Sequence, residues 1–304
     1  MGMVFASTAE EWAALTTSWF VPLEVSHVSD GFRGSIDQRP VGPARLALVR
    51  STRCTVDRTR DLIGSSADDE VLFSVRLEGA NAVEQHGSTA HVRPGAGVFY
   101  FSGAPYRLGF PNSGSELVFQ TSRAMIGLSR AAVENLTARP VDGRSAPELR
   151  AYVALVKSSF GPSPWLPQGE DLARTASELL AGLARRLTGV VTGSLSPEAL
   201  LALMRQQVAD QLDDPRLDVS LLARRHGVSV RSVHNAFATA GLRPADYIRR
   251  ERIRRAAELI TQTRLPVTDI AILSGFSEPG TFTRAFKRLT GQTPSAARRP
   301  PAPG

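Results

Sequence analysis

The chain has 304 residues, about the length of two ordinary domains, and 42% of them are hydrophobic and 21% charged. These proportions are those of a globular protein, so they exclude a largely disordered chain and a fibrous repeat. The net charge of +7 is unevenly distributed: residues 216–299 hold sixteen Lys or Arg against six Asp or Glu, which is +10, and the rest of the chain carries −3. This asymmetry is typical of a nucleic-acid-binding domain joined to a neutral or slightly acidic one.

Three features of the sequence limit where the protein acts. A single cysteine, Cys54, excludes an intrachain disulfide and a Cys-x-x-Cys zinc or redox motif. The first twenty residues carry acids where a signal peptide has bases, and they lack its apolar core and cleavage site. No run of about 18 apolar residues occurs, so no membrane span is predicted. We therefore expect a soluble, cytoplasmic protein.

The first third of the chain, between Val21 and about Phe119, is predicted to form short β-strands. Alternating or continuous apolar runs at 45–49, 71–77 and 97–101 are separated by Gly, Pro, Asn and Asp. No helical pattern lies between these runs, and strands at such a spacing favour an antiparallel sandwich or barrel.

Helical patterns follow. Apolar residues at helical spacing predict helices over 146–160 and 171–187, with a Gly-Pro-Ser-Pro breaker at 161–164 between them. These two helices form an antiparallel pair that packs on its own barrel, or they are part of a dimer seam; the pattern favours neither. After a Gly/Ser/Thr stretch at 188–195, Ser196-Pro197-Glu198 begins a largely helical segment with a cap and a first-turn proline.

Two stretches of the basic segment, residues 221–229 and 269–277, share the pattern Ala-x3-Gly-x-Ser. The alanine lets two helices approach closely, the glycine adopts the left-handed turn conformation, and the serine caps the next helix. This is the pattern of a helix-turn-helix. We predict two such units, at about 218–239 and 267–289, joined by a helix at 244–261.

The second helix of each unit is amphipathic. The residues predicted to face the core are Val230, Val233 and Phe237 in the first unit and Phe282, Phe286 and Leu289 in the second. Arg, Asn and Thr on the opposite side suit base edges and phosphates. The candidate DNA-binding residues are Ser229, Arg231, Ser232, His234, Asn235, Gly280, Thr281, Thr283, Arg284 and Lys287.

The basic segment resembles the signature of the AraC/XylS family of bacterial transcription regulators. The resemblance is carried by Ile270-Ala271-x3-Gly275-Phe276-Ser277, Phe282-x-Arg284-x-Phe286-Lys287 and Gly291-x-Thr293-Pro294, and upstream by Ala223, Gly227, Ser229, Phe237, Gly241 and Pro244. It covers residues 197–299. The resemblance implies two reading helices that enter successive major grooves about 34 Å apart on one face of the duplex.

The resemblance also assigns base-facing positions, which are Arg231, His234 and Asn235 in the first unit and Pro279, Gly280, Thr283 and Arg284 in the second. Pro279 and Gly280 lack side-chain donors where the family commonly has polar residues, so we expect the second unit to read DNA shape and phosphate more than bases. Of the arginines on the joining helix, we expect one or two to bind phosphate. These are Arg249, Arg250, Arg252, Arg254 and Arg255.

The strand-rich part contains a run, residues 91–108, that resembles the cupin-like effector domain preceding this DNA-binding module in many family members. It departs from that pattern at Ala96, where Asp is common. The resemblance implies a small antiparallel barrel whose interior can hold a ligand. Candidate effector-binding residues, suited to an aromatic or carboxylated metabolite, are Arg50, Phe73, Arg76, Arg93, Phe99, Phe101 and Tyr106. The aromatic ones are alternatively barrel core.

A cupin enzyme needs a metal site. The five histidines include no His-x-His pair, and His226 and His234 lie in the DNA-binding segment, so we expect neither a metal nor a cofactor. The other three are His27, His86 and His91. Cys54 is either a thiol sensor or simple packing.

Together these patterns predict an α+β chain: a cupin-like effector domain at 1–140, a helical linker and dimerisation segment at 141–195, and a DNA-binding domain at 196–299. We expect a ligand-responsive activator of a metabolic operon. It would bind double-stranded promoter DNA, RNA polymerase and a small-molecule effector as a homodimer, in the bacterial cytoplasm and on the nucleoid. The alternatives are a cupin-type enzyme carrying a DNA-binding module and a constitutive DNA-binding regulator without an effector.

Overall fold

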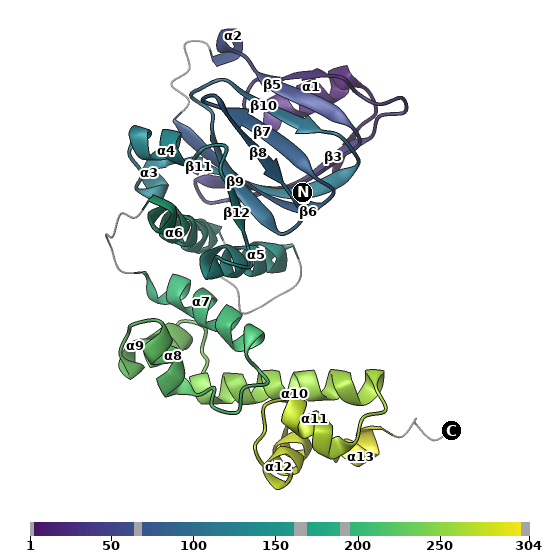
Figure 1. Ribbon diagram of the computed structural model, residues 1–304, viewed down its shortest axis with the longest axis vertical. Coiled ribbons are helices and arrows are strands. Elements are labelled where there is room, and N and C mark those ends of the chain that lie inside the picture. The colour runs from purple at the N-terminus through teal and green to yellow at the C-terminus, as the bar shows by residue number, and fades with distance from the viewer. Residues whose placement is uncertain (1–2, 64–68, 161–168, 189–194, 299–304) are drawn as a thin grey trace. The chain divides into compact units, whose positions relative to one another are not determined.

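The computed structural model describes residues 3–63, 69–160, 169–188 and 195–298 (Figure 1). The chain divides into two compact units, Met1–Ser196 and Pro197–Gly304. Within the described ranges, no helix is both long and apolar enough to span a lipid bilayer.

The N-terminal unit is built on two antiparallel sheets. The seven-stranded sheet has the order β1 (Val4–Ala6), β3 (Gly34–Val41), β4 (Ala44–Ser51), β11 (Gly114–Ser122), β6 (Glu70–Glu78), β9 (Ala96–Phe101) and β12 (Pro140–Asp142). The five-stranded sheet has the order β2 (Glu24–Ser26), β5 (Cys54–Arg58), β10 (Tyr106–Phe110), β7 (Asn81–Gln85) and β8 (Ser88–Val92). Both sheets are open, so the predicted barrel is a cupin-like sandwich. The predicted α+β fold class is confirmed.

The central strands β11, β6 and β9 of the seven-stranded sheet are buried on both faces. Leu72 belongs to the core between the sheets, whereas its neighbour Phe73 lies on the other side of β6 and packs against Tyr152, with ring centroids 5.4 Å apart. Tyr152 belongs to α5 (Pro147–Ser159), which covers this face together with α6 (Gly169–Thr188) (Figure 1). A strand buried on both faces has no polar side, which explains the continuous apolar runs of the sequence.

Helices α5 and α6 run antiparallel. Glu148 in the first turn of α5 forms an ion pair of 2.8 Å with Arg186 in the last turn of α6. Nearly all apolar side chains of the pair are buried, and Leu187 is the one large apolar side chain of the two described helices that is more than a third exposed. The smaller helices of the unit are α1 (Ala9–Trp19), α2 (Arg60–Ile63), α3 (Arg123–Ile126) and α4 (Arg130–Leu136).

The C-terminal unit is entirely helical in its described part. Its helices are α7 (Pro197–Asp210), α8 (Val219–Arg225), α9 (Val230–Ala238), α10 (Pro244–Gln262), α11 (Val267–Leu273), α12 (Pro279–Thr290) and α13 (Pro294–Ala297). The long helix α10 contributes side chains to two small hydrophobic cores. Near its start, Tyr247 packs on Phe237 of α9 at 5.4 Å between ring centroids, and further along Ile253 and Ile260 join a cluster with α11 and α12.

Candidate nucleic-acid interface

The two predicted turns have the same backbone geometry. Gly227 has φ +63° and Gly275 has φ +77°, which are left-handed conformations that favour glycine. In each turn the residue after the glycine donates its N–H to the carbonyl of the buried alanine five positions earlier. Both hydrogen bonds, Val228 to Ala223 and Phe276 to Ala271, measure 3.0 Å. The Ala-x3-Gly spacing therefore forms the same tight corner twice.

The serines of the repeated pattern differ in role. Ser229 is the N-cap of α9, and its hydroxyl accepts the N–H of Ser232 at 3.0 Å. In α12 the N-cap is Glu278, without a side-chain cap, and the helix begins with a proline that has no N–H to satisfy. The prediction that a serine caps each reading helix is right for Ser229 and wrong for Ser277.

The buried faces of the two reading helices have equal spacing. The buried residues are Val233, Ala236 and Phe237 in α9 and Phe282, Ala285 and Phe286 in α12. The prediction that Val230 and Leu289 face the core is wrong, since they are 44% and 40% exposed. Both lie in end turns that the neighbouring helices do not cover.

The outer face of α9 presents polar groups that are free to bind. Arg231, His234 and Asn235 are exposed, and their side chains make no hydrogen bond or ion pair to another residue of the described part. Ser232 is half-buried, with its hydroxyl 2.8 Å from that of Ser229. A guanidinium, an imidazole and an amide that point into solvent have the donors and acceptors that base edges recognise in the major groove.

The outer face of α12 carries a surface chain of polar contacts. Arg284 donates through Nη2 to Thr281 Oγ1, and Thr281 donates to Glu278 Oε2, each at 3.4 Å. Lys287 is exposed one turn further along. Arg284 and Lys287 thus place two cations on the same side of the helix.

The start of α12 offers little to a base edge. Gly280 borders open space, and half-buried Thr283 donates its hydroxyl to the carbonyl of Pro279 at 3.0 Å, so this donor is engaged within the helix. These three positions therefore provide backbone surface rather than free side-chain donors.

The arginines of α10 fall into three groups. Arg249 and Arg254 form ion pairs with acids of the same helix, at 3.2 Å to Asp246 and 2.6 Å to Glu258. Arg250 is exposed and makes no side-chain contact of this kind within the described ranges. Arg255 belongs with the first group, since it lies 4.0 Å from Glu258 of the same helix. Arg252 forms the third group, because it is half-buried and donates to backbone carbonyls. Arg250 is thus the arginine of this helix with its charge free for phosphate.

The predicted effector residues do not form one pocket. Phe73 and Phe99 stack at 4.5 Å on the helix-covered face, and Arg130 of α4 lies 5.8 Å from the ring of Phe101. Alternation along β6 and β9 places all three aromatic side chains away from the space between the sheets, so they are core between the seven-stranded sheet and its helices.

Two other members of that set, Arg76 and Tyr106, do lie between the sheets. Arg76 is 1% exposed and pairs with buried Glu116 at 3.6 Å, while Tyr106 packs on Tyr100 at 5.1 Å. The cavity here, lined in part by Trp12, measures about 30 Å³, which is room for about one water molecule. This cavity is far smaller than the sites of about 300–1,000 Å³ that usually hold small molecules.

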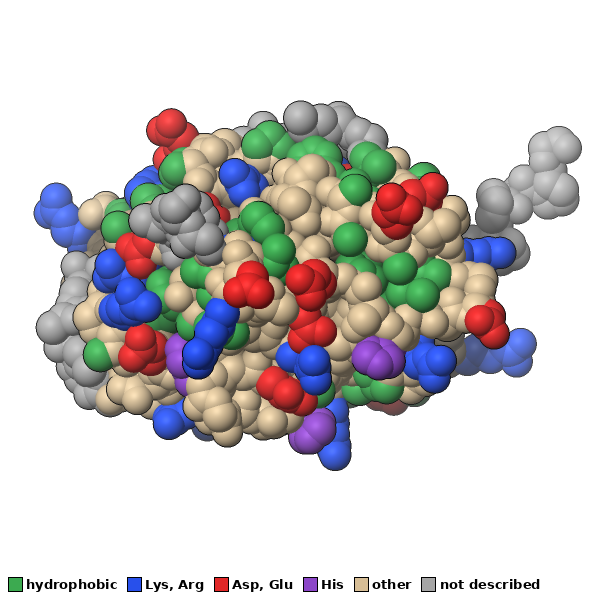
Figure 2. Space-filling model, turned by 90° about the horizontal axis from the view of Figure 1, so that it is seen from above, with side chains coloured by type: hydrophobic (Ala, Val, Ile, Leu, Met, Phe, Trp, Pro, Cys, Tyr) green, Lys and Arg blue, Asp and Glu red, His purple; other side chains and the backbone are tan. Residues whose placement is uncertain are grey.

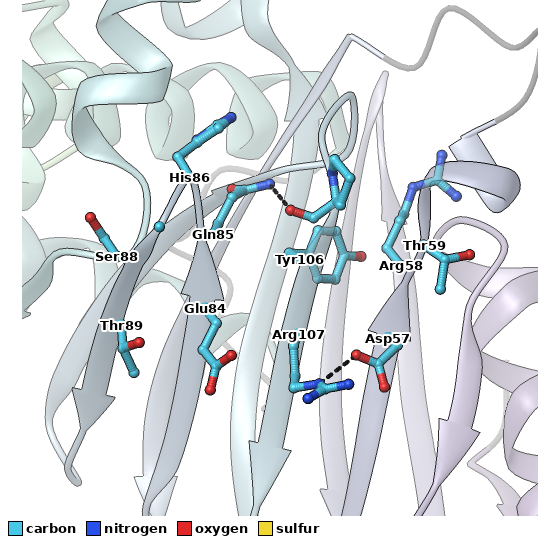
Figure 3. A pocket seen from close by; sticks show the side chains of 12 residues that line it. Asp57, Arg58, Thr59, Glu84, Gln85, His86, Ser88, Thr89, Tyr106 and Arg107 are labelled. Atoms are coloured by element: carbon cyan, nitrogen blue, oxygen red, sulfur yellow. Dashed lines mark hydrogen bonds and ion pairs between the residues drawn. The ribbon is translucent and has the colours of Figure 1, made fainter.

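The remaining two arginines are exposed on opposite sides of the sandwich. Arg50 lies on the seven-stranded sheet, and Arg93 lines a hollow of about 620 Å³ on the outer side of the five-stranded sheet. A neighbouring hollow of about 480 Å³ lies further along that sheet (Figure 3). On the face of the sandwich seen in Figure 2, acidic and basic side chains are interspersed rather than gathered by sign.

Neither metal nor thiol chemistry gains support in the N-terminal unit. The described residues hold no group of three or more His, Cys, Asp or Glu side chains that could ligate a metal. Cys54 is buried, and burial raises the pKa of its thiol to about 11. Since the thiolate is the reactive form, the packing interpretation of Cys54 fits better than the sensor interpretation.

Comparisons with known proteins cover both units. A family model described as an AraC-binding-like domain matches residues 12–184, and one described as a helix-turn-helix domain matches residues 222–300. The chain is 25% identical to the transcriptional activator NphR of a Rhodococcus species over 86% of its own length and 79% of that protein. It is 32% identical to the transcriptional regulator VirS of Mycobacterium tuberculosis over 54% of its own length and 38% of that protein.

A solved structure shows a similar fold. The AraC-like transcriptional activator CuxR aligns over 84% of this chain and 95% of its own, with a TM-score of 0.52 and 15% identity. At this identity the likeness concerns the fold alone. The aligned part of this chain includes residues of both the sandwich and the helical C-terminal unit.

Proposed function

The chain belongs to the AraC family of transcription regulators and is a DNA-binding regulator, and we propose that α9 and α12 read two neighbouring half-sites of one promoter. The observation that carries this proposal is the repetition of one corner geometry within residues 216–299, a segment of net charge +10. Each corner presents a helix whose apolar side is buried and whose polar side is exposed. Rigid units in tandem favour an asymmetric site with one half-site per helix.

The two half-sites are not read alike. Three unpaired polar side chains on α9 favour hydrogen bonding to bases, whereas the backbone and cationic surface of α12 favours DNA shape and phosphate. We therefore expect strong base preference in the half-site of α9 and weak preference in that of α12. Arg250 on α10 adds a phosphate contact that is independent of sequence.

The N-terminal unit makes regulation depend on a small molecule, through a difference in affinity for that molecule between two arrangements of the protein. We infer activation in the bacterial cytoplasm, by contact with RNA polymerase, from the similarity to proteins named as activators. A homodimer formed through residues 146–187 stays a prediction. The described part of that segment leaves small and polar side chains outward, so a seam there would have little apolar area.

Genome-wide footprinting of the bound full-length chain tests the regulatory function. We expect discrete occupied sites upstream of transcription starts, and changed transcription of the adjacent genes when the protein is removed. Occupancy spread evenly over the genome, with no transcript changed, would contradict it.

A further inference from the structure

We propose that the effector is an organic anion that binds outside the sandwich, in the hollow of about 620 Å³ on the five-stranded sheet, here called the outer hollow. This inference rests on the proposed dependence of regulation on a small molecule. The volume lies within the range of about 300–1,000 Å³ that is usual for ligand sites. The interior cavity of about 30 Å³ has no such room.

The floor of the outer hollow exists because small residues meet across three strands. Gly109 of β10 lies beside Thr55 of β5 on one side and Ala82 of β7 on the other, and Ala82 lies beside His91 of β8. A side chain at Gly109 would meet only the methyl group of Ala82, at 3.9 Å. The sheet therefore offers a recess with an apolar base, to which Phe110 also contributes at one end.

The rim of the outer hollow is cationic. Its exposed lining residues include two arginines and two histidines, which are Arg53, Arg93, His27 and His91. No Asp or Glu is among the described lining residues. Neither arginine side chain has a hydrogen-bond or ion-pair partner in the described part of the chain. An apolar floor with unpaired guanidinium groups at its rim suits a ligand that has a carboxylate on an apolar framework. The framework would be buried against the floor, while the carboxylate would pair with the arginines.

The neighbouring hollow provides an internal contrast. There Arg107 donates through Nε to Asp57 Oδ1 at 2.7 Å, and Glu84 lies on the other side of the same guanidinium (Figure 3). Its cation is thus already neutralised by acids of adjacent strands. Free positive charge therefore belongs to the outer hollow rather than to the whole sheet.

A polar chain connects the outer hollow with the opposite sheet. Asn81 lines the hollow, is 4% exposed and has a buried Oδ1 without a partner in the described structure. Its Nδ2 donates to Glu116 Oε2 at 3.2 Å, and Glu116 pairs with Arg76. A ligand that displaces Asn81 would change this buried pair, which gives binding a route to the helix-covered sheet.

Phthalate, with its neutral analogue phthalamide as a control, tests the assignment on the full-length chain. We expect phthalate to shift the imidazole NMR signals of His27 and His91 but not those of His86, His226 and His234. Arg53→Ala with Arg93→Ala should weaken phthalate binding about tenfold or more, whereas Arg50→Ala, on the other sheet, should leave it unchanged. Shifts confined to His226 and His234, equal binding of phthalamide, or no binding would overturn the proposal.

Failure of this site would leave the regulator itself standing. The doubly substituted protein should still bind its DNA sites without ligand, because neither arginine lies in the C-terminal unit. Loss of phthalate binding with DNA binding intact supports the outer hollow. Absence of specific DNA binding in the unsubstituted protein would instead contradict the proposed function.

A separate observation, within the C-terminal unit, points to Arg252 as the residue that sets the distance between the two half-sites. Its Nη2 donates to the carbonyl of Asp214 at 2.7 Å and to that of Leu217 at 3.3 Å, and its Nε donates to Leu212 at 3.3 Å. These carbonyls belong to the loop that leads into α8. Burial lowers the pKa of this guanidinium, while the nearby carboxylate of Asp214 acts in the opposite direction.

The same guanidinium contacts the second corner. It lies 6.0 Å from the ring centre of Phe276, next to Gly275. A Cβ at Gly275 would come within 2.0 Å of the Leu212 carbonyl and 2.7 Å of Arg252 Nε. The loop before α8 and the turn before α12 therefore meet at Arg252, which makes it a positioning residue for the two reading helices.

Binding to duplexes whose half-sites are separated by the selected spacing, or by one base pair more or less, tests this role. We expect the unsubstituted protein to lose about tenfold in affinity on a one-base-pair change, and Arg252→Ala to lose much less. Arg252→Lys keeps the charge but not the three contacts, so it should also flatten the dependence. Arg250→Ala should lower affinity by the same factor at every spacing. If the Arg252 variants are helical by circular dichroism and keep the original spacing preference, the proposal is wrong.

Discussion

The matched pair Gly227→Ala and Gly275→Ala separates backbone conformation from close packing at the two corners. Both glycines have positive φ, so each alanine costs about 1–2 kcal/mol for the left-handed conformation. At Gly227 no atom lies within 4 Å of an added Cβ, and this cost should be the whole effect. At Gly275 the Cβ would lie 2.0 Å from the Leu212 carbonyl, so the loop must move and the Arg252 contact weaken. Overpacking adds about 1–3 kcal/mol, for a total of about 2–5 kcal/mol.

Hydrogen exchange of the full-length chain, read from peptides of α8 to α12, measures both effects as free energies of opening. Gly291→Ala is a further control, because Gly291 ends α12 at φ +82° with nothing within 4 Å. We expect Gly227→Ala and Gly291→Ala to be similar and Gly275→Ala to be clearly worse. Equal losses at Gly227 and Gly275, within about 0.5 kcal/mol, would refute the close approach of the Leu212 loop to the second corner.

Three further predictions concern single side chains. Arg231→Ala should relax base preference in the half-site of α9, whereas Arg284→Ala should weaken binding uniformly; the opposite pattern in gel shifts on randomised half-sites would contradict the assignment. Ser229→Ala should destabilise α9 by about 1 kcal/mol in hydrogen exchange and Ser277→Ala should have little effect on α12, so equal effects would count against the cap. Burial raises the pKa of Glu116 despite the opposing guanidinium nearby, so the folded state holds this proton more tightly than the unfolded state. The free energy of unfolding of the N-terminal unit should therefore fall as pH rises from the usual glutamate range through the raised pKa. Unfolding followed by tryptophan fluorescence measures this fall, and Glu116→Gln should remove it. The same fall in the variant would exclude Glu116 as its source.

The tandem corners could be predicted because their determinants are local. An alanine, a glycine four positions later and an amphipathic helix specify the turn from within about twenty residues, and the structure has that turn twice. Whether the end turn of a helix is buried depends on neighbouring helices, which the local pattern does not show. For this reason the prediction that Val230 and Leu289 face the core was wrong. Ser277 failed for a different local reason, since α12 begins one residue later than the repeat predicts, with Glu278 as its N-cap and Pro279 as its first residue.

The N-terminal unit was predictable as strands but not as a site. Phe73 and Phe99 lie on strands that are apolar on both faces, so alternation could not show which face borders the ligand space. The outer hollow depends on Gly109, Ala82 and Thr55 meeting across three strands, which is a matter of pairing register. Arg252 was one of five arginines of which one or two were expected to bind phosphate, and nothing in the sequence reveals the loop carbonyls that it contacts.

Hydroxyl-radical footprinting of the full-length chain on its selected duplex measures most directly whether both corners read DNA. We expect two protected segments of DNA, about one helical turn apart on one face of the duplex. Arg231→Ala should weaken protection of the segment bound by α9 more than protection of the segment bound by α12. Protection of a single groove, or a footprint in which Arg231→Ala and Arg284→Ala weaken the same segment, would contradict tandem reading by α9 and α12.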